Sequence, residues 1–174
     1  MDLQINVAEL LRENVGANRT VEFDAAVLEL EDQEPSQVNG KLVLTKTDKG
    51  IWAAGRLDVS ADHVCSRCLV PFSTQLHTEM ADVFLPKVDP FNGEKIRYEE
   101  GDADADILGI DDHHVLNLSD ALRQYRQAAM PLAPLCKDDC EGLCPGCGVD
   151  WNVATCECEP NLDPRWNKLR ELLG

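Results

Sequence analysis

The chain has 174 residues, with 32 acidic and 16 basic side chains and a formal net charge of −16. This length is enough for one domain with a substantial core, or for a domain with a small appendage, and it excludes a large multidomain enzyme. The negative charge disfavours extensive binding to a phosphate backbone, which requires clustered lysine and arginine, and it suits a basic protein partner.

The N-terminal sequence MDLQINVAELLRENVG lacks the features of an export signal. It has no basic region and no apolar run of signal-peptide length, and no run of about 18 apolar residues occurs in the chain. We therefore expect a cytoplasmic protein without a membrane span. Cytosolic thiols stay reduced, so the 8 cysteines favour metal binding or redox chemistry over structural disulfides.

The first predicted element is a short amphipathic helix. Within residues 6–14, Val7, Leu10 and Leu11 recur at helical spacing, and Gly16 follows as a stop. After this helix the sequence changes to alternating apolar and polar residues, which is typical of half-buried strands.

The next region is predicted to consist of antiparallel strands. Alternation marks a strand over residues 20–30, residues 31–40 form a loop, and residues 41–65 form strands joined at residues 48–50. Residues 71–85 are predicted to form a long strand with a bulge or bend. The alternating positions are Val21, Phe23, Ala25 and Val27 in the first strand, and Phe72, Thr74, Leu76, Thr78, Met80 and Val83 in the last.

An acidic segment follows at residues 86–114, with nine acidic and three basic side chains. We predict a mobile surface loop here, with one short strand at residues 96–98. Its DADADILGIDD stretch resembles the start of an EF-hand, but Ile107 stands where glycine is required and His113 where the bidentate glutamate belongs. Calcium binding is therefore not expected.

Two further helices are predicted. One covers residues 118–130, capped by Asn117 or Ser119 and ended by Pro131 and Pro134. The other covers residues 163–173, after Asp163 as N-cap and Pro164 at the first helical position. The apolar faces hold Leu118, Leu122, Tyr125 and Ala129 in the first helix, and Trp166, Leu169 and Leu172 or Leu173 in the second.

These elements predict an α+β fold. We expect a mostly antiparallel sheet or partly closed barrel with flanking helices, followed by a cysteine-rich zinc-knuckle segment. The predicted domains are residues 1–134, which include the acidic loop at 86–114, and residues 135–174, which bind metal and end in the last helix.

All 8 cysteines occur in closely spaced pairs. Zinc prefers four thiolates, and a pair with short spacing lets one turn supply two of them. The sequence therefore predicts two structural four-cysteine zinc sites. Iron also occupies such a geometry, but zinc is favoured. The pairs are Cys65 with Cys68, Cys136 with Cys140, Cys144 with Cys147, and Cys156 with Cys158.

The spacing favours one partition of the pairs without compelling it. The CPGCG sequence from Cys144 to Gly148 suits a tight turn whose amides face the sulfurs, because glycine allows positive φ. Its nearby partner is the Cys156/Cys158 pair. By subtraction, the Cys136/Cys140 pair meets the Cys65/Cys68 pair and joins the strand region to the C-terminal segment.

Other chemistry is less well supported. Thiol switching needs cationic groups near the sulfurs, and apart from Arg67 and Lys137 the neighbouring charges are acidic, which works against a low thiol pKa. No phosphate-binding glycine motif occurs, and no catalytic constellation is evident, so we expect no enzyme. The histidines are expected to be structural or on the surface; the candidates weighed as ligands are His63, His113 and His114.

Two blocks of sequence resemble a known family. They are CSRCLVPF at residues 65–72, and PLAPLCKDDCEGLCPGCGVDWNVATCEC at residues 131–158 followed by DPRWNKLRELL. In this order they are similar to the YceD family of bacterial and plastid proteins, named for the accumulation of large-subunit ribosomal RNA. VDWN stands where the family pattern more often has a short Asn-rich turn. Members that keep the C-x-R-C pair but lack the GLCPxCG block favour the same partition of the cysteines.

The resemblance implies a non-enzymatic ribosome assembly factor, in a family often encoded beside a small basic ribosomal protein. We expect it to bind a basic ribosomal protein or a large-subunit assembly intermediate, with indirect or local RNA contact. The alternative is a zinc-linked thiol redox sensor or chaperone, and the net charge disfavours a transcription-associated zinc ribbon. The local basic-aromatic patch comprises Trp151, Trp166, Arg165, Lys168 and Arg170.

Overall fold

The computed structural model describes residues 3–30, 34–98 and 108–158. The chain divides into two compact units. The first contains Met1–Ala61 and Thr74–Met130, and it holds the sheet core and both of the helices within the described residues. The second contains Asp62–Ser73 and Pro131–Gly174, and it holds all 8 cysteines.

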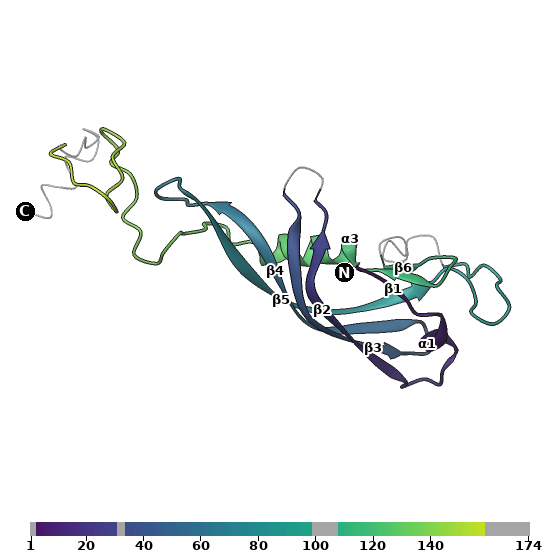
Figure 1. The fold of residues 1–174 in the computed structure, drawn as a ribbon. Helices are drawn as coiled ribbons and strands as arrows, with labels where there is room; N and C mark the ends of the chain where they lie inside the picture. The colour runs from purple at the N-terminus through teal and green to yellow at the C-terminus, as the bar shows by residue number, and fades with distance from the viewer. Residues whose placement is uncertain (1–2, 31–33, 99–107, 159–174) are drawn as a thin grey trace, which may run out of the picture. The chain divides into compact units, whose positions relative to one another are not determined.

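A strongly curled sheet of seven strands dominates the fold (Figure 1). Its spatial order is β1-β7-β6-β5-β4-β3-β2, so β1 and β2 are the two edge strands. All the pairings with a recorded register are antiparallel except that of β5 with β6. The predicted mostly antiparallel, partly closed sheet is therefore confirmed. The strands are β1 (Gln4–Asn6), β2 (Asn18–Leu28), β3 (Ser36–Lys46), β4 (Ile51–Val64), β5 (Pro71–Pro86), β6 (Gly109–Ile110) and β7 (Val115–Asn117).

Helix α1 (Ala8–Arg12) confirms the first predicted helix, although it is shorter than residues 6–14. Leu10 and Leu11 are buried, as their spacing predicts. The chain then turns at Gly16, whose φ of +95° suits glycine. No described helix is both long and apolar enough to cross a membrane.

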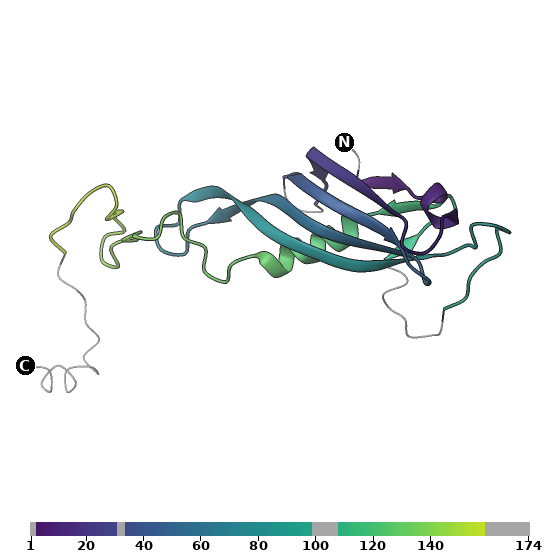
Figure 2. The same ribbon diagram turned by 90° about the horizontal axis from the view of Figure 1, so that it is seen from below.

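Helix α3 (Ser119–Ala129) confirms the prediction for residues 118–130 and lies along one face of the sheet (Figure 2). Asn117 accepts a hydrogen bond from the Ser119 amide through Oδ1 at 3.0 Å. Leu122 is fully buried, and the Tyr125 hydroxyl oxygen accepts a hydrogen bond from the Ala81 amide of β5 at 3.2 Å. The helix thus fills the inside of the curl.

The core of the first unit is mainly aliphatic, as the small number of aromatic residues predicts. It combines side chains from α1, from the start of α3 and from the inner face of the sheet. Its largest fully buried side chains are Phe84, Leu3, Leu11, Leu28, Leu42, Leu44, Ile51, Leu57, Met80, Ile110, Leu116 and Leu118.

A β-bulge in β2 overturns part of the predicted strand pattern. The register of β2 against β3 shifts between Phe23 and Ala26, and Ala25 has a φ of +50°. The extra residue reverses the faces beyond it. As a result Ala26 and Leu28 are buried, whereas Val27 is 51% exposed. The prediction that Ala25 and Val27 share the face of Phe23 is wrong.

Strand β3 begins inside the predicted loop of residues 31–40. Ser36 and Val38 are buried, and Val38 pairs with Ala26 of β2 and with Val59 of β4. The polar composition of residues 36–40 predicts a loop. Pairing with strands on both sides stabilises the strand instead, and local sequence does not reveal such pairing. Beyond it, the predicted strands within residues 41–65 and their connection at residues 48–50 are confirmed.

Strand β5 confirms the predicted long strand but not its change of phase. The buried residues Leu76, Thr78, Met80 and Phe84 keep one alternation, and Val83 is only half-buried. The change of phase expected from Val83 is therefore wrong, whereas the strand does bend, as predicted (Figure 1).

The segment 86–114 contains more pairing than predicted. Ile110 is fully buried, because β6 pairs with the end of β5 and with β7. The strand predicted at residues 96–98 is absent from the described residues; instead Val88 and Lys95 form an isolated bridge. Residues 99–107 of the acidic loop, and the helix predicted at 163–173, lie outside the described residues.

Candidate metal centre

The turn between β4 and β5 presents the first cysteine pair. The Cys65 amide donates to the Val70 carbonyl at 3.0 Å, and the Leu69 amide donates back to the Cys65 carbonyl at 3.0 Å. The Arg67 amide points at Cys65 Sγ, with N···S at 3.5 Å. This tight loop holds both thiols on one side of the hairpin turn.

The CPGCG turn repeats this geometry at the same sequence offsets. The Cys144 amide donates to the Val149 carbonyl at 2.8 Å, and the Gly148 amide donates to the Cys144 carbonyl at 2.9 Å. The Gly146 amide lies 3.4 Å from Cys144 Sγ. The two CxxC turns are thus the same structural motif, with Leu69 (φ +61°) standing where the second turn has Gly148 (φ +76°).

The first group brings together Cys65, Cys68, Cys136 and Cys140. All four sulfur atoms lie within 4.8 Å of one another. Cys65 Sγ is 3.7 Å from Cys140 Sγ, and Cys68 Sγ is 3.6 Å from Cys136 Sγ. Three of these cysteines are buried, with Cys65 fully so, and Phe72, Leu135 and Leu143 pack around them.

Backbone contacts bring the distant pair to this turn. The Ser66 amide donates to the Pro134 carbonyl at 2.8 Å, and the Leu143 amide donates to the Arg67 carbonyl at 3.2 Å. The Arg67 guanidinium also donates to the Cys140 carbonyl at 2.7 Å. Arg67 therefore has a structural role beside the sulfurs.

The second group brings together Cys144, Cys147, Cys156 and Cys158, again within 4.8 Å. This group is more open, since Cys144 is buried but Cys147 and Cys158 are exposed. Gly146 lies beside this group, where a Cβ would make an ordinary contact of 3.4 Å with Cys158 Cβ. The two groups correspond to the partition that the spacing favoured.

Two side chains that were not predicted as sulfur partners, Asn152 and Trp151, also contact the cysteines. Asn152 donates to Cys140 Sγ at 3.4 Å and accepts from the Glu141 amide at 3.0 Å, so it links the second loop to the first group. Trp151 Nε1 lies 3.4 Å from Cys156 Sγ. Both lie in VDWN, where nothing but proximity to the knuckle could have signalled this role.

The sulfur geometry fits a four-coordinate metal. A tetrahedral ion with Zn–S bonds of about 2.3 Å requires sulfur atoms about 3.8 Å apart. In the first group the Cys68–Cys136 and Cys65–Cys140 sulfur atoms lie 3.6 and 3.7 Å apart, and the four sulfur atoms of the second group lie within 4.8 Å of one another. All 8 cysteines are free thiols. No other group of potential metal ligands occurs among the described residues, and the described histidines lie outside both groups.

The three histidines weighed as ligands have other surroundings. His63 is buried beside Phe72, with ring centroids 5.6 Å apart, and its Nε2 has no hydrogen-bond partner. His114 adopts a φ of +59° in the turn before β7, where its amide donates to the Asp111 carbonyl. The His113 amide donates to the Asp111 side chain.

Amide donors lower the pKa of the first thiol in each CxxC turn. The Cys68 amide, assisted by those of Cys136 and Arg67, lowers the pKa of Cys65 to about 6. The Cys147 and Gly146 amides lower the pKa of Cys144 to about 6. For these two thiols the expectation from acidic neighbours is wrong, because backbone N–H groups point directly at the sulfur.

One later thiol in each group, Cys136 in the first and Cys158 in the second, has the opposite shift. Burial, followed by the thiols of Cys68 and Cys140, raises the pKa of Cys136 to about 12. Contact with the thiols of Cys147 and Cys144 raises the pKa of Cys158 to about 12. Thiolates this close together repel one another, so the four thiols do not all lose their protons readily. A bound cation removes that repulsion.

Residues 53–173 match the family described as large ribosomal RNA subunit accumulation protein YceD. The chain belongs to the YceD family. The matched region contains all 8 cysteines and both CxxC turns. The resemblance drawn from the two sequence blocks is therefore confirmed at the level of the family.

Relatives of this YceD protein occur in mycobacteria. An uncharacterized protein of Mycobacterium tuberculosis is 27% identical over 133 residues, which cover 76% of this chain and 60% of that protein. An uncharacterized protein of Mycobacterium leprae is 25% identical over 137 residues, covering 79% and 59%. The chain thus spans about 60% of the length of these relatives. No solved structure matches.

Replacing Leu69 with glycine is expected to strengthen metal binding at the first group. Leu69 is 62% exposed, so its side chain contributes little packing, while its left-handed backbone costs about 1 kcal/mol relative to glycine. Competition with a coloured chelator should show about fivefold tighter binding. Gly148→Leu is the matched control and should weaken the second group, and weaker binding by the Leu69→Gly protein would contradict the strain argument.

Proposed function

We propose that this YceD-family protein is a non-enzymatic factor that supports the accumulation of large-subunit ribosomal RNA. The observation that carries the proposal is the family match over residues 53–173. The protein would act by binding a basic ribosomal protein or a large-subunit assembly intermediate. The protein would act in the cytoplasm, where free thiols such as these 8 cysteines stay reduced.

The proposal includes two zinc ions with a structural role. Thiolate groups are preferred ligands of zinc. Sulfur separations of 3.6 and 3.7 Å in the first group suit tetrahedral coordination, and the four sulfur atoms of the second group lie within 4.8 Å of one another. The first ion would be held by Cys65, Cys68, Cys136 and Cys140, and the second by Cys144, Cys147, Cys156 and Cys158. The zinc of the first group would join residues 62–73 to the segment that begins at residue 131.

Charge supports a basic protein partner. The net charge is −16, and the described part of the second unit has six acidic and two basic side chains. Of those two basic residues, Arg67 donates to a backbone carbonyl and Lys137 lies 3.9 Å from Asp139. Few cations are therefore available there for phosphate contacts, and direct RNA binding by this surface would be unfavourable.

Sedimentation of ribosomal particles tests this function. An affinity-tagged chain expressed in its own cells should migrate with large-subunit precursors and co-purify with a ribosomal protein, because an assembly factor binds unfinished particles. Depletion of the protein should lower the ratio of large-subunit to small-subunit ribosomal RNA. A tagged unrelated acidic protein is the control. Migration solely in the particle-free fractions, with an unchanged RNA ratio, would reject the proposal.

The exposed second group supports an alternative role as a redox sensor. Cys147 and Cys158 are exposed, which makes the group accessible to oxidants, although the thiol with the lowered pKa, Cys144, is buried and the pKa of Cys158 is raised. A sensor would release its metal reversibly at low peroxide concentration, and this release can be followed with a metal-binding dye. Structural sites would keep their metal, and chelation would unfold the segment.

A further inference from the structure

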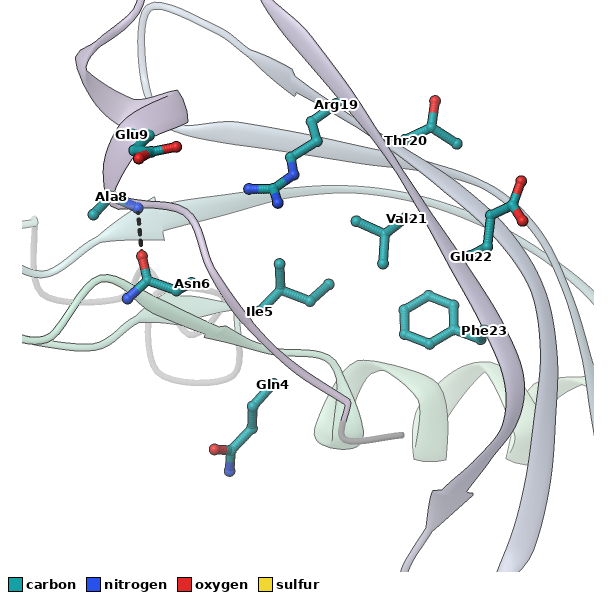
Figure 3. A pocket seen from close by; sticks show the side chains of 10 residues that line it. All are labelled: Gln4, Ile5, Asn6, Ala8, Glu9, Arg19, Thr20, Val21, Glu22 and Phe23. Atoms are coloured by element: carbon teal, nitrogen blue, oxygen red, sulfur yellow. Dashed lines mark hydrogen bonds between the residues drawn. The ribbon is translucent and has the colours of Figure 1, made fainter.

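The two edges of the curled sheet face the same hollow. Strand β1 pairs with β7 alone and β2 with β3 alone, so within the described residues each has one unpaired side. Residues from both edges, together with the start of α1, line a cavity of about 880 Å³. We call this opening the seam, and define it by Gln4–Asn6 of β1 and residues 19–23 of β2. Figure 3 shows it from close by.

The hydrogen-bond pattern shows which groups of β2 face the seam. The Lys46 amide donates to the Ala17 carbonyl in the register that continues through β2 and β3. Backbone direction alternates along an antiparallel strand. Val21, four residues after Ala17, therefore directs its N–H and C=O toward β3. Thr20 and Glu22 direct theirs into the seam.

Strand β1 presents its free groups in the same way. The Leu118 amide donates to the Leu3 carbonyl, in register with the pairing of Ile5 and Leu116. By the same alternation Ile5 bonds toward β7, whereas Gln4 and Asn6 direct their backbone groups into the seam. Two rows of unused donors and acceptors thus flank one cavity.

The floor of the seam is apolar and its rim is polar. Ile5 and Val21 are half-buried and Phe23 is buried, and all three pack against the core. In Figure 3 their side chains point into the space between the two strands. The polar residues that border it are Gln4, Asn6, Glu9, Thr20 and Glu22. Arg19 lies on the same face of β2 as Val21 and Phe23, and its side chain extends into the space between the two strands (Figure 3). An added strand places alternate side chains on these two surfaces, apolar ones inward and polar ones outward.

Strand β2 is also unprotected where it borders the seam. Proteins commonly block an exposed edge with lysine, proline or a bulge. Residues 18–23 contain no lysine and no proline, the bulge lies after Phe23, and Arg19 is the one charged side chain of this stretch on the inner face. This stretch is therefore open to pairing with another chain.

We propose that the seam binds an extended, basic segment of a partner protein as an added strand between β1 and β2. Unpaired backbone on both sides calls for an extended chain, and the apolar floor calls for alternating apolar side chains. The net charge of −16 favours a basic segment and disfavours a second copy of this chain or an RNA strand, each of which adds negative charge. The inference rests on the proposed function, since it locates the partner of that function.

Hydrogen exchange of the full-length protein tests the geometry. The probe is a blocked heptapeptide of alternating lysine and valine, and its counterpart has glutamate in place of lysine. The Thr20 and Glu22 amides should exchange fast in the free protein and slow at least about tenfold with the basic peptide. The Val21 amide should be protected in both states. Slow exchange of Thr20 and Glu22 without peptide, protection elsewhere, or equal binding of the acidic peptide would overturn the inference.

Two variants at Thr20 test binding at the seam separately from the proposed assembly function. Thr20→Pro removes an N–H that faces the seam and spares the ladder with β3, whereas Thr20→Val keeps that N–H. Thermal melting shows whether each variant is folded. Thr20→Pro should bind the basic peptide about tenfold more weakly and lose its migration with ribosomal particles, and Thr20→Val should retain both.

The outcomes are distinct for the two proposals. Full particle binding by a folded Thr20→Pro protein overturns the seam inference and leaves the assembly function standing. Absence of particle binding by the unaltered protein rejects the assembly function itself. If Thr20→Pro does not fold, exchange of the Thr20 and Glu22 amides in the unaltered protein decides the seam alone.

Discussion

A protein with Cys65→Ser and Cys68→Ser is expected to hold one metal ion per chain, and the unaltered protein is expected to hold two. The two thiols supply half of the first group, and no described histidine or carboxylate joins that group as a replacement ligand. Two remaining thiolates bind zinc far more weakly than four. Mass spectrometry of the metal content after gel filtration measures the loss directly.

The pairing of the cysteines is tested by placing the two substitutions in different groups. Cys65→Ser with Cys144→Ser removes one ligand from each group, so both ions are expected to be bound more weakly and to be lost to a chelator that leaves the unaltered protein loaded. The matched control, Cys147→Ser with Cys158→Ser, should keep one ion, because both residues lie in the second group. One ion retained by the first of these proteins, or none by the control, would contradict the grouping.

Loss of the ion from the first group should also destabilise the cluster of side chains around Cys65, Cys68, Cys136 and Cys140. Cys65 and Cys140 are almost completely buried and have Phe72, Leu135 and Leu143 around them. Without metal, four crowded thiols would form the centre of this small cluster. The cluster has few other buried side chains to stabilise it. The first unit has its own aliphatic core, so its unfolding transition should persist.

The grouping of the cysteines was accessible from sequence because short spacing limits which thiols can meet. The equivalence of the two CxxC turns, in contrast, could not be predicted from sequence. Glycine at position 148 signals a left-handed residue, whereas leucine at position 69 hides one, and the structure shows the same backbone at both places. Likewise, acidic side chains are visible in the sequence, but the amides that lower the pKa of Cys65 become visible only in the folded turn.

Long strands with clear alternation were predicted well, while short or interrupted ones were not. β1 and β7 have three residues each, too few for a periodic pattern, and their pairing depends on contacts across the chain. The bulge at Ala25 lies in a run of apolar residues that fits either phase. These unpredicted features are the ones that form the seam, since β1 supplies one edge and the bulge ends the open stretch of β2.

The curl that brings the two edges together depends on glycines in β3 and β4. A Cβ on Gly55 would lie 2.1 Å from the Lys41 carbonyl oxygen, and one on Gly40 would lie 2.3 Å from the Arg56 carbonyl oxygen. Strands approach this closely only where a sheet bends sharply and a residue has no side chain. The two glycines thus permit the bend in the middle of the sheet.

Gly40→Ala and Gly55→Ala are therefore expected to destabilise the first unit strongly. At Gly55 the new methyl group meets backbone that cannot move independently, at a cost of about 3 kcal/mol. Gly40 also has a φ of +136°, so its replacement should cost about 4 kcal/mol. Urea unfolding followed by circular dichroism measures these losses.

Gly93→Ala is the control that measures the cost of a positive φ without a steric clash. Gly93 has a φ of +73°, but nothing lies within 4 Å of its would-be Cβ, so its replacement should cost about 1 kcal/mol. The expected order of destabilisation is then Gly40→Ala, Gly55→Ala and Gly93→Ala. A cost at Gly55 as small as that at Gly93 would show that β3 and β4 can separate without loss. The bend, and with it the seam, would then not depend on this close contact.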